Sequence, residues 1–337
     1  MAEPFLKLGR EDRREVLEAA FGRGLARSMA LLEKDVWVVW ALEALFGSPF
    51  AEDLAFKGGT SLSKAYKVIS RFSEDVDLTY DIRKLVDDKA GQPEALSQVE
   101  AKALGRKIRE KLLPRFLMNE VLPYLEAQIL IQGLPATVEC EGENLFISYE
   151  SAADYPAYVR PRVKLEFGAR STGEPATRIE VTCDLATIFA EVTFPIATPR
   201  VMTAERTFWE KATLAHVYCL EGKLRGAAGF ARHWHDLVRL NRAGVADRAK
   251  SDLVLALAVA DHKSKFFPAK DAAGEWVDYQ SAVSGGLILI PRGDAYFALK
   301  ADYEAMIEAG YLENGAETFE MLMDSCRELQ DALSSRA

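Results

Sequence analysis

The stretch FKGGTSLSKAYKVISRFSEDVDL, residues 56–78, decides the fold of this chain. It contains a Gly-Gly turn, then a segment long enough for a helix, and then Asp75 and Asp77 on either side of one valine. Because side chains alternate along a strand, the two aspartates share one strand face. Neighbouring carboxylates on an otherwise apolar strand repel each other and lose hydration. The pattern therefore predicts a divalent cation between them, magnesium or, in its place, manganese.

The glycine turn indicates an anion site beside that cation. Gly58 and Gly59 allow backbone N–H groups to approach a ligand closely, and the helix predicted after them, from about Ser61 to Ser70, presents its N-terminus to a triphosphate. A phosphate-binding turn beside a carboxylate pair is an arrangement suited to nucleotidyl transfer. We expect the phosphates to be held by Gly58, Gly59, Thr60, Ser61 and Lys64.

A third carboxylate for the metal is expected from one of two later strands. In RVKLEFG, residues 162–168, alternation places Lys164 and Glu166 on one face, opposite the apolar residues between them. Glu166 would complete the metal site and accept the proton of an incoming hydroxyl, and Lys164 would neutralise triphosphate charge. The alternatives are two acids of the next strand segment, RIEVTCD, namely Glu180 and Asp184.

The order strand, Gly-Gly-Thr, helix, strand, Asp-x-Asp resembles the polymerase-beta-like nucleotidyltransferase superfamily. More narrowly, FKGGTSLSK followed by RFSEDVDL resembles the AbiEii/AbiGii-type nucleotidyltransferase toxins, the toxin half of bacterial type IV toxin–antitoxin and phage-defence pairs. ERTFWEKATLAH, residues 205–216, and ARHWHDLVRL, residues 231–240, are similar to the helical signatures of that group. The resemblance runs from about Asp53 to the C-terminus and is weakest over residues 81–142.

The resemblance assigns further residues. It favours Glu166 as the third acid, because the lysine-x-acid pair is similar to the second motif of the family. It implies that Lys211 and Glu205 contribute to nucleotide binding, with a surface pair between Lys211 and Glu210 as the alternative. It also implies that Ser73 lies beside the metal, where phosphorylation would add negative charge and act as an off-switch. The alternative for Ser73 is a turn-forming role.

The activity that the resemblance implies is transfer of a nucleoside monophosphate from an NTP to an acceptor hydroxyl, with release of pyrophosphate. The leading acceptor is the 3′ end of tRNA, and such transfer would inhibit translation and growth. The implied partner is an antitoxin encoded nearby, with or without direct binding. Two alternatives stay open: transfer to a protein or small molecule, and a module that binds GTP without transfer.

Length and composition predict an α+β protein of two domains. The 337 residues are 49% hydrophobic, enough to bury sizeable cores. We expect a nucleotidyltransferase-type mixed sheet with flanking helices in residues 1–200 and a helical domain in residues 201–337. No stretch has the pattern of a membrane span or signal peptide, which predicts a cytoplasmic protein. The formal net charge of −9 means that binding of nucleic acid requires a local basic face.

The hydrophobic periodicity predicts the surrounding elements. Helices are expected at 11–32 and 36–46, with a long helical stretch at 97–130 that is interrupted at Pro114 and Pro123. In the C-terminal part, a long loop is expected at 267–293, and Arg232 and Asp236 are expected to pair one helical turn apart. Strands are expected at 137–140, 145–149, 162–167 and 178–183.

Overall fold

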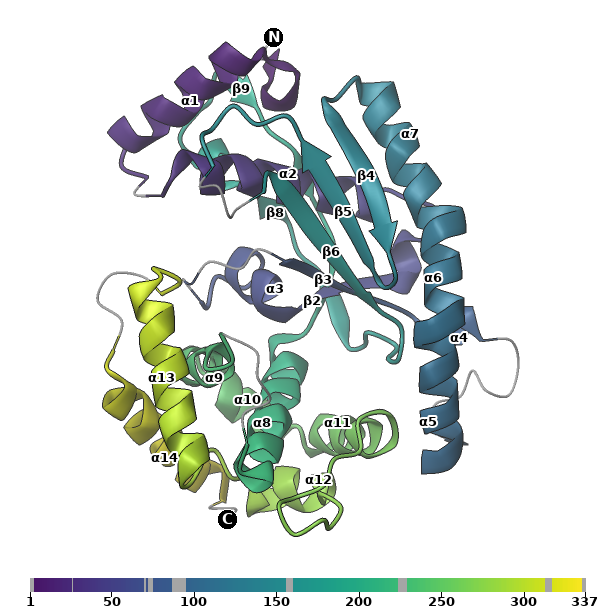
Figure 1. The fold of residues 1–337 in the computed structure, drawn as a ribbon, viewed down its shortest axis with the longest axis vertical. Coiled ribbons are helices and arrows are strands. Elements are labelled where there is room, and N and C mark those ends of the chain that lie inside the picture. The colour runs from purple at the N-terminus through teal and green to yellow at the C-terminus, as the bar shows by residue number, and fades with distance from the viewer. Residues whose placement is uncertain are drawn as a thin grey trace. The chain divides into compact units, whose positions relative to one another are not determined.

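The computed structural model describes residues 3–25, 27–69, 71, 75–86, 95–155, 160–223, 229–312 and 317–334 (Figure 1). The chain forms two compact units. The first consists of Met1–Ala65, Glu74–Asp87 and Arg106–Val201, and the second of Tyr66–Ser73, Asp88–Gly105 and Met202–Ala337. The division expected at residue 200 lies beside the last of these boundaries, but two earlier segments of the chain belong with the second unit.

A seven-stranded mixed sheet forms the centre of the first unit. Its strands are β2 (Leu54–Lys57), β3 (Asp75–Tyr80), β4 (Ala136–Glu141), β5 (Asn144–Tyr149), β6 (Arg162–Gly168), β7 (Ala176–Arg178) and β11 (Arg200–Met202). They follow the order β4-β5-β6-β3-β2-β11-β7. β3 is parallel to β6 and β11 to β2, whereas β2–β3, β4–β5 and β5–β6 are antiparallel. The predicted α+β class with a mixed sheet is confirmed.

The alternation predicted for the two central strands is confirmed. Val76 and Leu78 of β3 are fully buried, as are Val163 and Leu165 of β6, while the polar residues between them are partly or fully exposed. One face of these strands therefore belongs to the core and the other carries charge. The strand predicted at 178–183 is interrupted, because β7 ends at Arg178 and β8 (Val181–Thr182) pairs separately with β10 (Ile196–Ala197). A second small pair joins β1 (Glu3–Pro4) and β9 (Val192–Thr193).

Two helices precede the sheet in the chain, α1 (Arg10–Gly22) and α2 (Met29–Phe46). The continuous helix predicted for residues 11–32 is wrong, because α1 ends at Gly22 and Gly24 adopts a φ of +96°, which L-residues rarely adopt. α2 is buried along most of its length. Its Trp37 stacks on Tyr149 of β5 with ring centroids 4.9 Å apart, which packs the helix against the sheet.

The long helical stretch consists of α5 (Gln98–Lys107), α6 (Leu113–Phe116) and α7 (Leu122–Gln132), joined by π-helical segments at Ile108–Leu112 and Leu117–Val121. Pro114 and Pro123 therefore do not interrupt it, contrary to the prediction. A proline cannot donate the usual hydrogen bond, and a wider π turn directly before each proline allows the helix to continue. Gly133, with a φ of +66°, ends the stretch.

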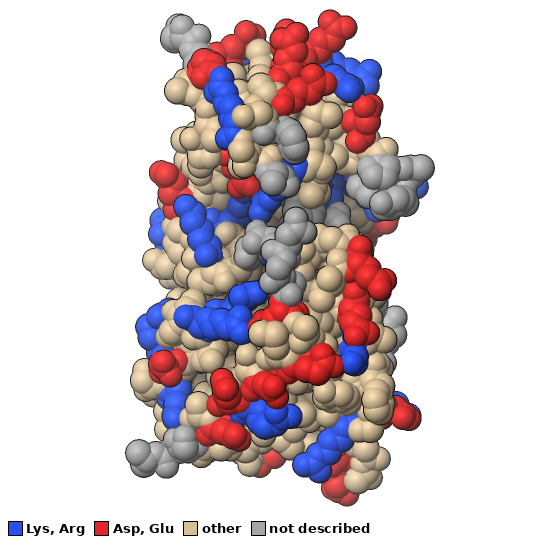
Figure 2. All heavy atoms as spheres, turned by 90° about the vertical axis from the view of Figure 1, so that its left-hand side faces the viewer, with Lys and Arg blue, Asp and Glu red and all other residues tan. Residues whose placement is uncertain are grey.

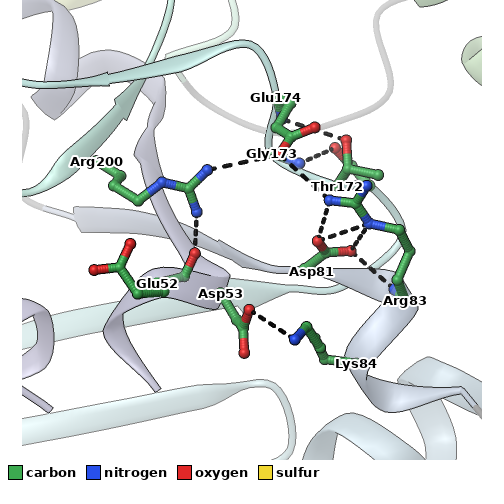
Figure 3. A network of polar contacts seen from close by, with 10 residues as sticks. Glu52, Asp53, Asp81, Arg83, Lys84, Thr172, Gly173, Glu174 and Arg200 are labelled. Atoms are coloured by element: carbon green, nitrogen blue, oxygen red, sulfur yellow. Dashed lines mark hydrogen bonds and ion pairs between the residues drawn. The ribbon is translucent and has the colours of Figure 1, made fainter. Parts of the chain in front are cut away.

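A polar network joins the ends of β2 and β3 that lie far from Asp75 (Figure 3). Asp81 follows β3 and caps α4 (Ile82–Leu85), and Arg83 donates to its carboxylate at 2.9 Å. The same guanidinium lies 3.3 Å from Glu174, in the loop after β6. Arg200 of β11 lies 3.8 Å from Glu174 and also donates to the carbonyl of Glu52. This network holds the loop after β6 against the sheet.

The second unit is helical. Its helices are α8 (Ala204–Glu221), α9 (Arg232–Arg242), α10 (Val245–Ser251), α11 (Leu253–Phe266), α12 (Tyr279–Ser281), α13 (Asp294–Glu308) and α14 (Phe319–Ser334). Trp209 and Trp234 are almost fully buried in its core, and their indole N–H groups donate to the carbonyls of Ala249 and Leu289. Within the described part of the chain, no helix has the length and apolar character needed to cross a membrane.

The segment predicted as a long loop at 267–293 is only partly irregular. It contains α12 and a π-helical turn at Ala282–Gly286. The bond from Trp234 to Leu289 and a bond from the Ile288 N–H to Nδ1 of His216 fix its second half against α9 and α8. Buried partners thus order a stretch whose glycines suggest a loop.

Candidate active site

The parallel pairing of β3 and β6 brings the predicted acids and lysine together. In this register Asp75 lies opposite Lys164, and Asp77 lies opposite Glu166. Lys164 Nζ is 2.6 Å from Glu166 Oε2 and 3.8 Å from Asp75 Oδ2. The four side chains form a charged cluster on the open face of the sheet. The two alternative acids lie elsewhere, because Glu180 is an exposed residue between β7 and β8 and Asp184 pairs with Lys64.

The glycine turn packs directly onto this cluster. Gly58 begins α3 (Gly58–Lys64) with a φ of +77°, and a Cβ atom there would lie 1.9 Å from Asp77 Oδ2. The hydroxyl of Thr60 donates to the carbonyl of Asp75, and that of Ser61 donates to the carbonyl of Gly58 at 2.9 Å. These contacts join the start of α3 to β3. The helix ends at Lys64 and is shorter than the helix predicted for residues 61–70.

Lys164 remains charged in this setting. Partial burial lowers the pKa of Lys164, but the hydrogen bond to Glu166 and the charges of Asp75, Glu166 and Asp77 outweigh this effect, so its pKa lies above the ordinary value. The lysine thus partly neutralises carboxylates that would otherwise repel one another. The Lys164 ammonium group therefore supplies positive charge beside Asp75 and Glu166.

The donor set suits a hard divalent cation. Magnesium prefers carboxylate oxygens, and Asp75 and Asp77 present two carboxylates from one strand face. Among the residues that the structure describes, no three His, Cys, Asp or Glu side chains lie together as a preformed metal site. In this structure Glu166 forms an ion pair with Lys164. Asp75 and Asp77 are the residues whose chemistry fits the metal, and Glu166 would join them only by leaving Lys164.

Glu166 also interacts electrostatically with Glu143, which belongs to a second charged group of the first unit. Burial raises the pKa of Glu143, and Glu166 raises it further, while Arg170 and Arg109 oppose the shift. Burial also lowers the pKa of Arg170, and the like charge of Arg109 adds to that effect. Arg109 lies between α5 and α6 and Arg170 lies after β6, and the fold brings the two arginines close enough to interact. Positive charge is thus present near the catalytic face despite the net charge of −9.

Lys64 lies differently from the expectation that it binds phosphate. Its Nζ is 2.5 Å from Asp35 Oδ1 of α2 and 2.7 Å from Asp184 Oδ1. Asp35 is buried and Asp184 is partly exposed, and the lysine side chain is only 12% exposed. The structure therefore places this ammonium between two protein carboxylates.

The helical signatures place Lys211 and Glu205 in the second unit. Lys211 Nζ lies 2.9 Å from Asp236, and Glu205 accepts a hydrogen bond from Arg248 at 2.7 Å. Asp236 is fully buried and also binds Arg71 through two hydrogen bonds of 2.7 and 2.8 Å. The ion pairs of Asp236 are thus with Arg71 and Lys211, and not with Arg232 as predicted. Ser73 lies outside the described residues.

The sequence does not identify Arg71 and Asp35, nor the partners that Asp236 has in the structure. Each is buried and paired with a partner far away in the chain, so no local spacing identifies it. The one signal in the sequence is a charged residue within an otherwise apolar stretch, because such a residue is expected to have a partner of opposite charge. Such a signal indicates that a partner exists but does not name it.

Comparisons with known proteins identify the family of this chain. A family model described as "Nucleotidyl transferase AbiEii toxin, Type IV TA system" matches residues 40–325. Among solved structures, MenT4, a nucleotidyltransferase toxin from Mycobacterium tuberculosis H37Rv, is similar at 19% identity over 97% of this chain and 98% of that chain, with a TM-score of 0.39. A search of curated protein sequences gave no match. Because the family model spans most of its length, this chain belongs to the AbiEii family of type IV toxin–antitoxin systems and is a nucleotidyltransferase.

Proposed function

We propose that this chain is a magnesium-dependent toxin that transfers a nucleoside monophosphate to the 3′ end of tRNA and thereby inhibits translation. The observation that carries the proposal is the register of β3 and β6, which sets Asp75 and Asp77 beside Lys164 and Glu166. A nucleotide-binding module without transfer needs no such group of acids. We further propose that the reaction takes place in the cytoplasm, where NTPs and tRNA are available, and that a nearby gene encodes the antitoxin.

The residues of the first unit have distinct roles in this proposal. Asp75 and Asp77 would hold the metal, which when bound supplies positive charge for the triphosphate and activates the acceptor hydroxyl. Lys164 stabilises the negative charge that develops on the phosphates, because it stays protonated beside the acids. Glu166 accepts the proton of the attacking hydroxyl. The turn at Gly58 and Gly59 brings the backbone close to Asp77, and we propose that its N–H groups bind the triphosphate.

Acceptor binding is proposed to use local positive charge. Figure 2 shows lysine and arginine side chains interspersed with aspartate and glutamate on the face it draws. Such a surface does not attract nucleic acid along its whole length, since the net charge is −9. Arg109 and Arg170, near Glu166, are the arginines we propose to contact the acceptor backbone. Lys211 and Glu205 of the second unit are proposed to contribute to nucleotide binding, as the family signatures suggest.

The proposal is tested by incubating the purified full chain with total tRNA, magnesium and each α-labelled NTP in turn. The expected result is label on tRNA with the intact protein and none with Asp75→Asn or with a chelator in excess of the metal. Asp154→Asn is the matched control, because Asp154 is an exposed aspartate of the same unit that pairs only at the surface with Arg14. It should label tRNA as the parent chain does.

Two other outcomes would redirect the assignment. Label on protein or on a small molecule, with none on tRNA, would support the alternative acceptors, which the net negative charge of the chain favours. Binding of a labelled NTP without transfer to any acceptor would contradict a transferase under these conditions and support the binding module. Equal labelling by the parent chain and by Asp75→Asn would overturn the assigned metal site.

A further inference from the structure

Lys64 lies at the C-terminal end of α3, six residues after the glycine at which the helix begins. Its ammonium group contacts Asp35 at 2.5 Å and Asp184 at 2.7 Å. The two aspartates are themselves joined, because the Asp184 N–H donates to Asp35 Oδ2 at 2.8 Å. Arg27 binds the second carboxylate oxygen of Asp184 at 2.5 Å. Two of the three N–H donors of the Lys64 ammonium group therefore bind carboxylates of the protein itself.

Burial makes this cluster costly to disturb. The Asp35 side chain is 6% exposed and that of Lys64 is 12% exposed. Burial lowers the pKa of Lys64, but the charges of Asp35 and Asp184 outweigh it and raise the pKa above its ordinary value. The lysine is thus held in its charged form by the two carboxylates. Moving Lys64 toward a triphosphate would take its ion pair from the buried Asp35 carboxylate.

The other end of α3 touches both catalytic aspartates. The Thr60 hydroxyl donates to the Asp75 carbonyl, and the Gly58 Cα lies so close to Asp77 that no Cβ fits between them. α3 is a single rigid element of seven residues, about 10 Å long at 1.5 Å per residue. A shift at Lys64 is therefore transmitted to Thr60 and Gly58, and from them to β3.

We propose that Lys64 is a positioning residue and not a ligand of the triphosphate. With Asp35 and Asp184 it fixes α3, and α3 fixes the Asp75 and Asp77 side chains in the geometry that transfer needs. This inference rests on the proposed function for its kinetic consequences, but its structural part does not depend on the acceptor.

The experiment compares Asp184→Asn, Lys64→Met and Lys64→Arg with a matched control, Lys265→Met. Lys265 is similarly shielded, at 15% exposure, and pairs with Asp261 on α11 of the second unit. Measurements are kcat and KM for the NTP, the thermal midpoint, and hydrogen–deuterium exchange of peptides that cover β3. Asp184→Asn retains the pair of Lys64 with Asp35, so it provides the test if Lys64→Met does not fold.

If Lys64 positions α3, Asp184→Asn and Lys64→Met both lower kcat, by about tenfold or more, while KM for the NTP changes little. Exchange in β3 rises in both variants and not in Lys265→Met, and Lys64→Arg restores most of the rate. A variant that combines Asp184→Asn with Lys64→Met is no slower than Lys64→Met alone, because both changes act on one element.

The inference is overturned if Lys64→Met raises KM for the NTP about tenfold while Asp184→Asn leaves the kinetics and the exchange of β3 unchanged. It is also overturned if the variants melt at lower temperature but keep the kcat and β3 exchange of the parent chain, since that result marks a purely structural role. A parent chain that labels no tRNA would contradict the proposed acceptor alone. The exchange of β3 would still decide the role of Lys64.

Discussion

Gly58 is the residue at which the candidate site tolerates the least change. Its φ of +77° favours glycine, and the space that a side chain would need is filled by the Asp77 carboxylate. The two constraints are independent, because one concerns the backbone and the other concerns the neighbour. The absence of a Cβ here therefore serves the position of a catalytic carboxylate as well as the turn.

Gly58→Ala is expected to reduce kcat about 100-fold or more, because the new methyl group must displace Asp77. The matched control is Gly142→Ala in the β4–β5 turn, where φ is +62° but no atom lies within 4 Å of the new Cβ. That variant should lose only about 1–2 kcal/mol of stability, the cost of a left-handed alanine, with unchanged kcat. The measurement is steady-state transfer together with urea unfolding. Similar activities in the two variants would contradict the role given to Asp77.

Asp236 is the buried carboxylate on which two cations of the second unit depend. Asp236→Asn leaves Arg71 and Lys211 without their shared partner and is expected to cost about 3–5 kcal/mol in the free energy of unfolding. Burial by itself raises the pKa of Asp236, but Lys211 and Arg71 outweigh it and hold the pKa well below its ordinary value. The stabilisation is therefore complete above the unfolded pKa of 3.8 and is lost as the pH falls toward the folded pKa.

Urea unfolding of the parent chain and of Asp236→Asn over a range of acidic pH checks this prediction. The difference in stability between the two proteins should shrink as the pH falls below 3.8. A constant difference across the range would mean that the Asp236 carboxylate is not the titrating group. Asp324→Asn, on the exposed face of α14, provides a surface control that should match the parent chain.

The composition of the candidate site was open to prediction only where it depends on neighbours in sequence. Asp75 and Asp77, like Lys164 and Glu166, lie two residues apart on a strand, so alternation alone places each pair on one face. The ion pair of Lys64 with Asp184 joins residues 120 positions apart, and that of Arg71 with Asp236 joins residues 165 positions apart. No periodicity contains that information. The sequence therefore predicts a phosphate as the partner of Lys64, whereas the structure pairs this lysine with two carboxylates.

Among the elements, β3 and β6 were predictable because each has one buried face. Prediction failed where backbone geometry overrides the hydrophobic pattern. Gly24 divides the helix predicted at 11–32, and the π-helical segments carry the long helix past Pro114 and Pro123. The segment at 267–293 is ordered by buried hydrogen bonds to Trp234 and His216, which composition does not show.

His216 gives α8 a pH-dependent contact with that segment. Its Nδ1 accepts the Ile288 N–H at 3.0 Å, and burial lowers its pKa from 6.5 to about 4. Between these values the unfolded chain binds a proton that the folded chain does not, so stability falls as the pH drops from 6.5 to about 4. The loss attributable to His216 is up to about 3 kcal/mol.

His216→Gln removes the titration while leaving a side-chain oxygen able to accept the same N–H. The free energy of unfolding of this variant, measured with urea across the window, should fall less steeply than that of the parent chain. Equal slopes would show that His216 does not carry the effect, and would direct attention to His233, whose pKa burial also lowers.

At the scale of the whole molecule, each unit is built from three separate segments of the chain. Residues 66–73 and 88–105 belong to the second unit, although they precede most of the sheet in sequence. Their Ile69, Ala101 and Leu104 are buried, and Arg71 binds the buried Asp236. A boundary drawn from sequence as a single cut near residue 200 therefore does not separate two complete units.

We expect a fragment of residues 202–337 to be unstable by itself, because it lacks Arg71 and the apolar residues of the two earlier segments. The check is circular dichroism with urea titration of the fragment beside the full chain. The fragment should show reduced helix content and a broad transition. A sharp transition with the helix content that the full structure assigns to these residues would show that the earlier segments are dispensable.

The alternation along β6 has a consequence for how genes of this kind can change length. Val163, Leu165 and Phe167 are buried while Lys164 and Glu166 face the catalytic side, so inserting or deleting one residue inside the strand would exchange the two sets. Such an event would bury a lysine and a glutamate and remove both from the aspartates in one step. We therefore expect insertions and deletions of single codons to be tolerated in turns such as the one at Gly142, where no atom lies within 4 Å of an added Cβ. Within the central strands, only substitutions are expected to preserve the site.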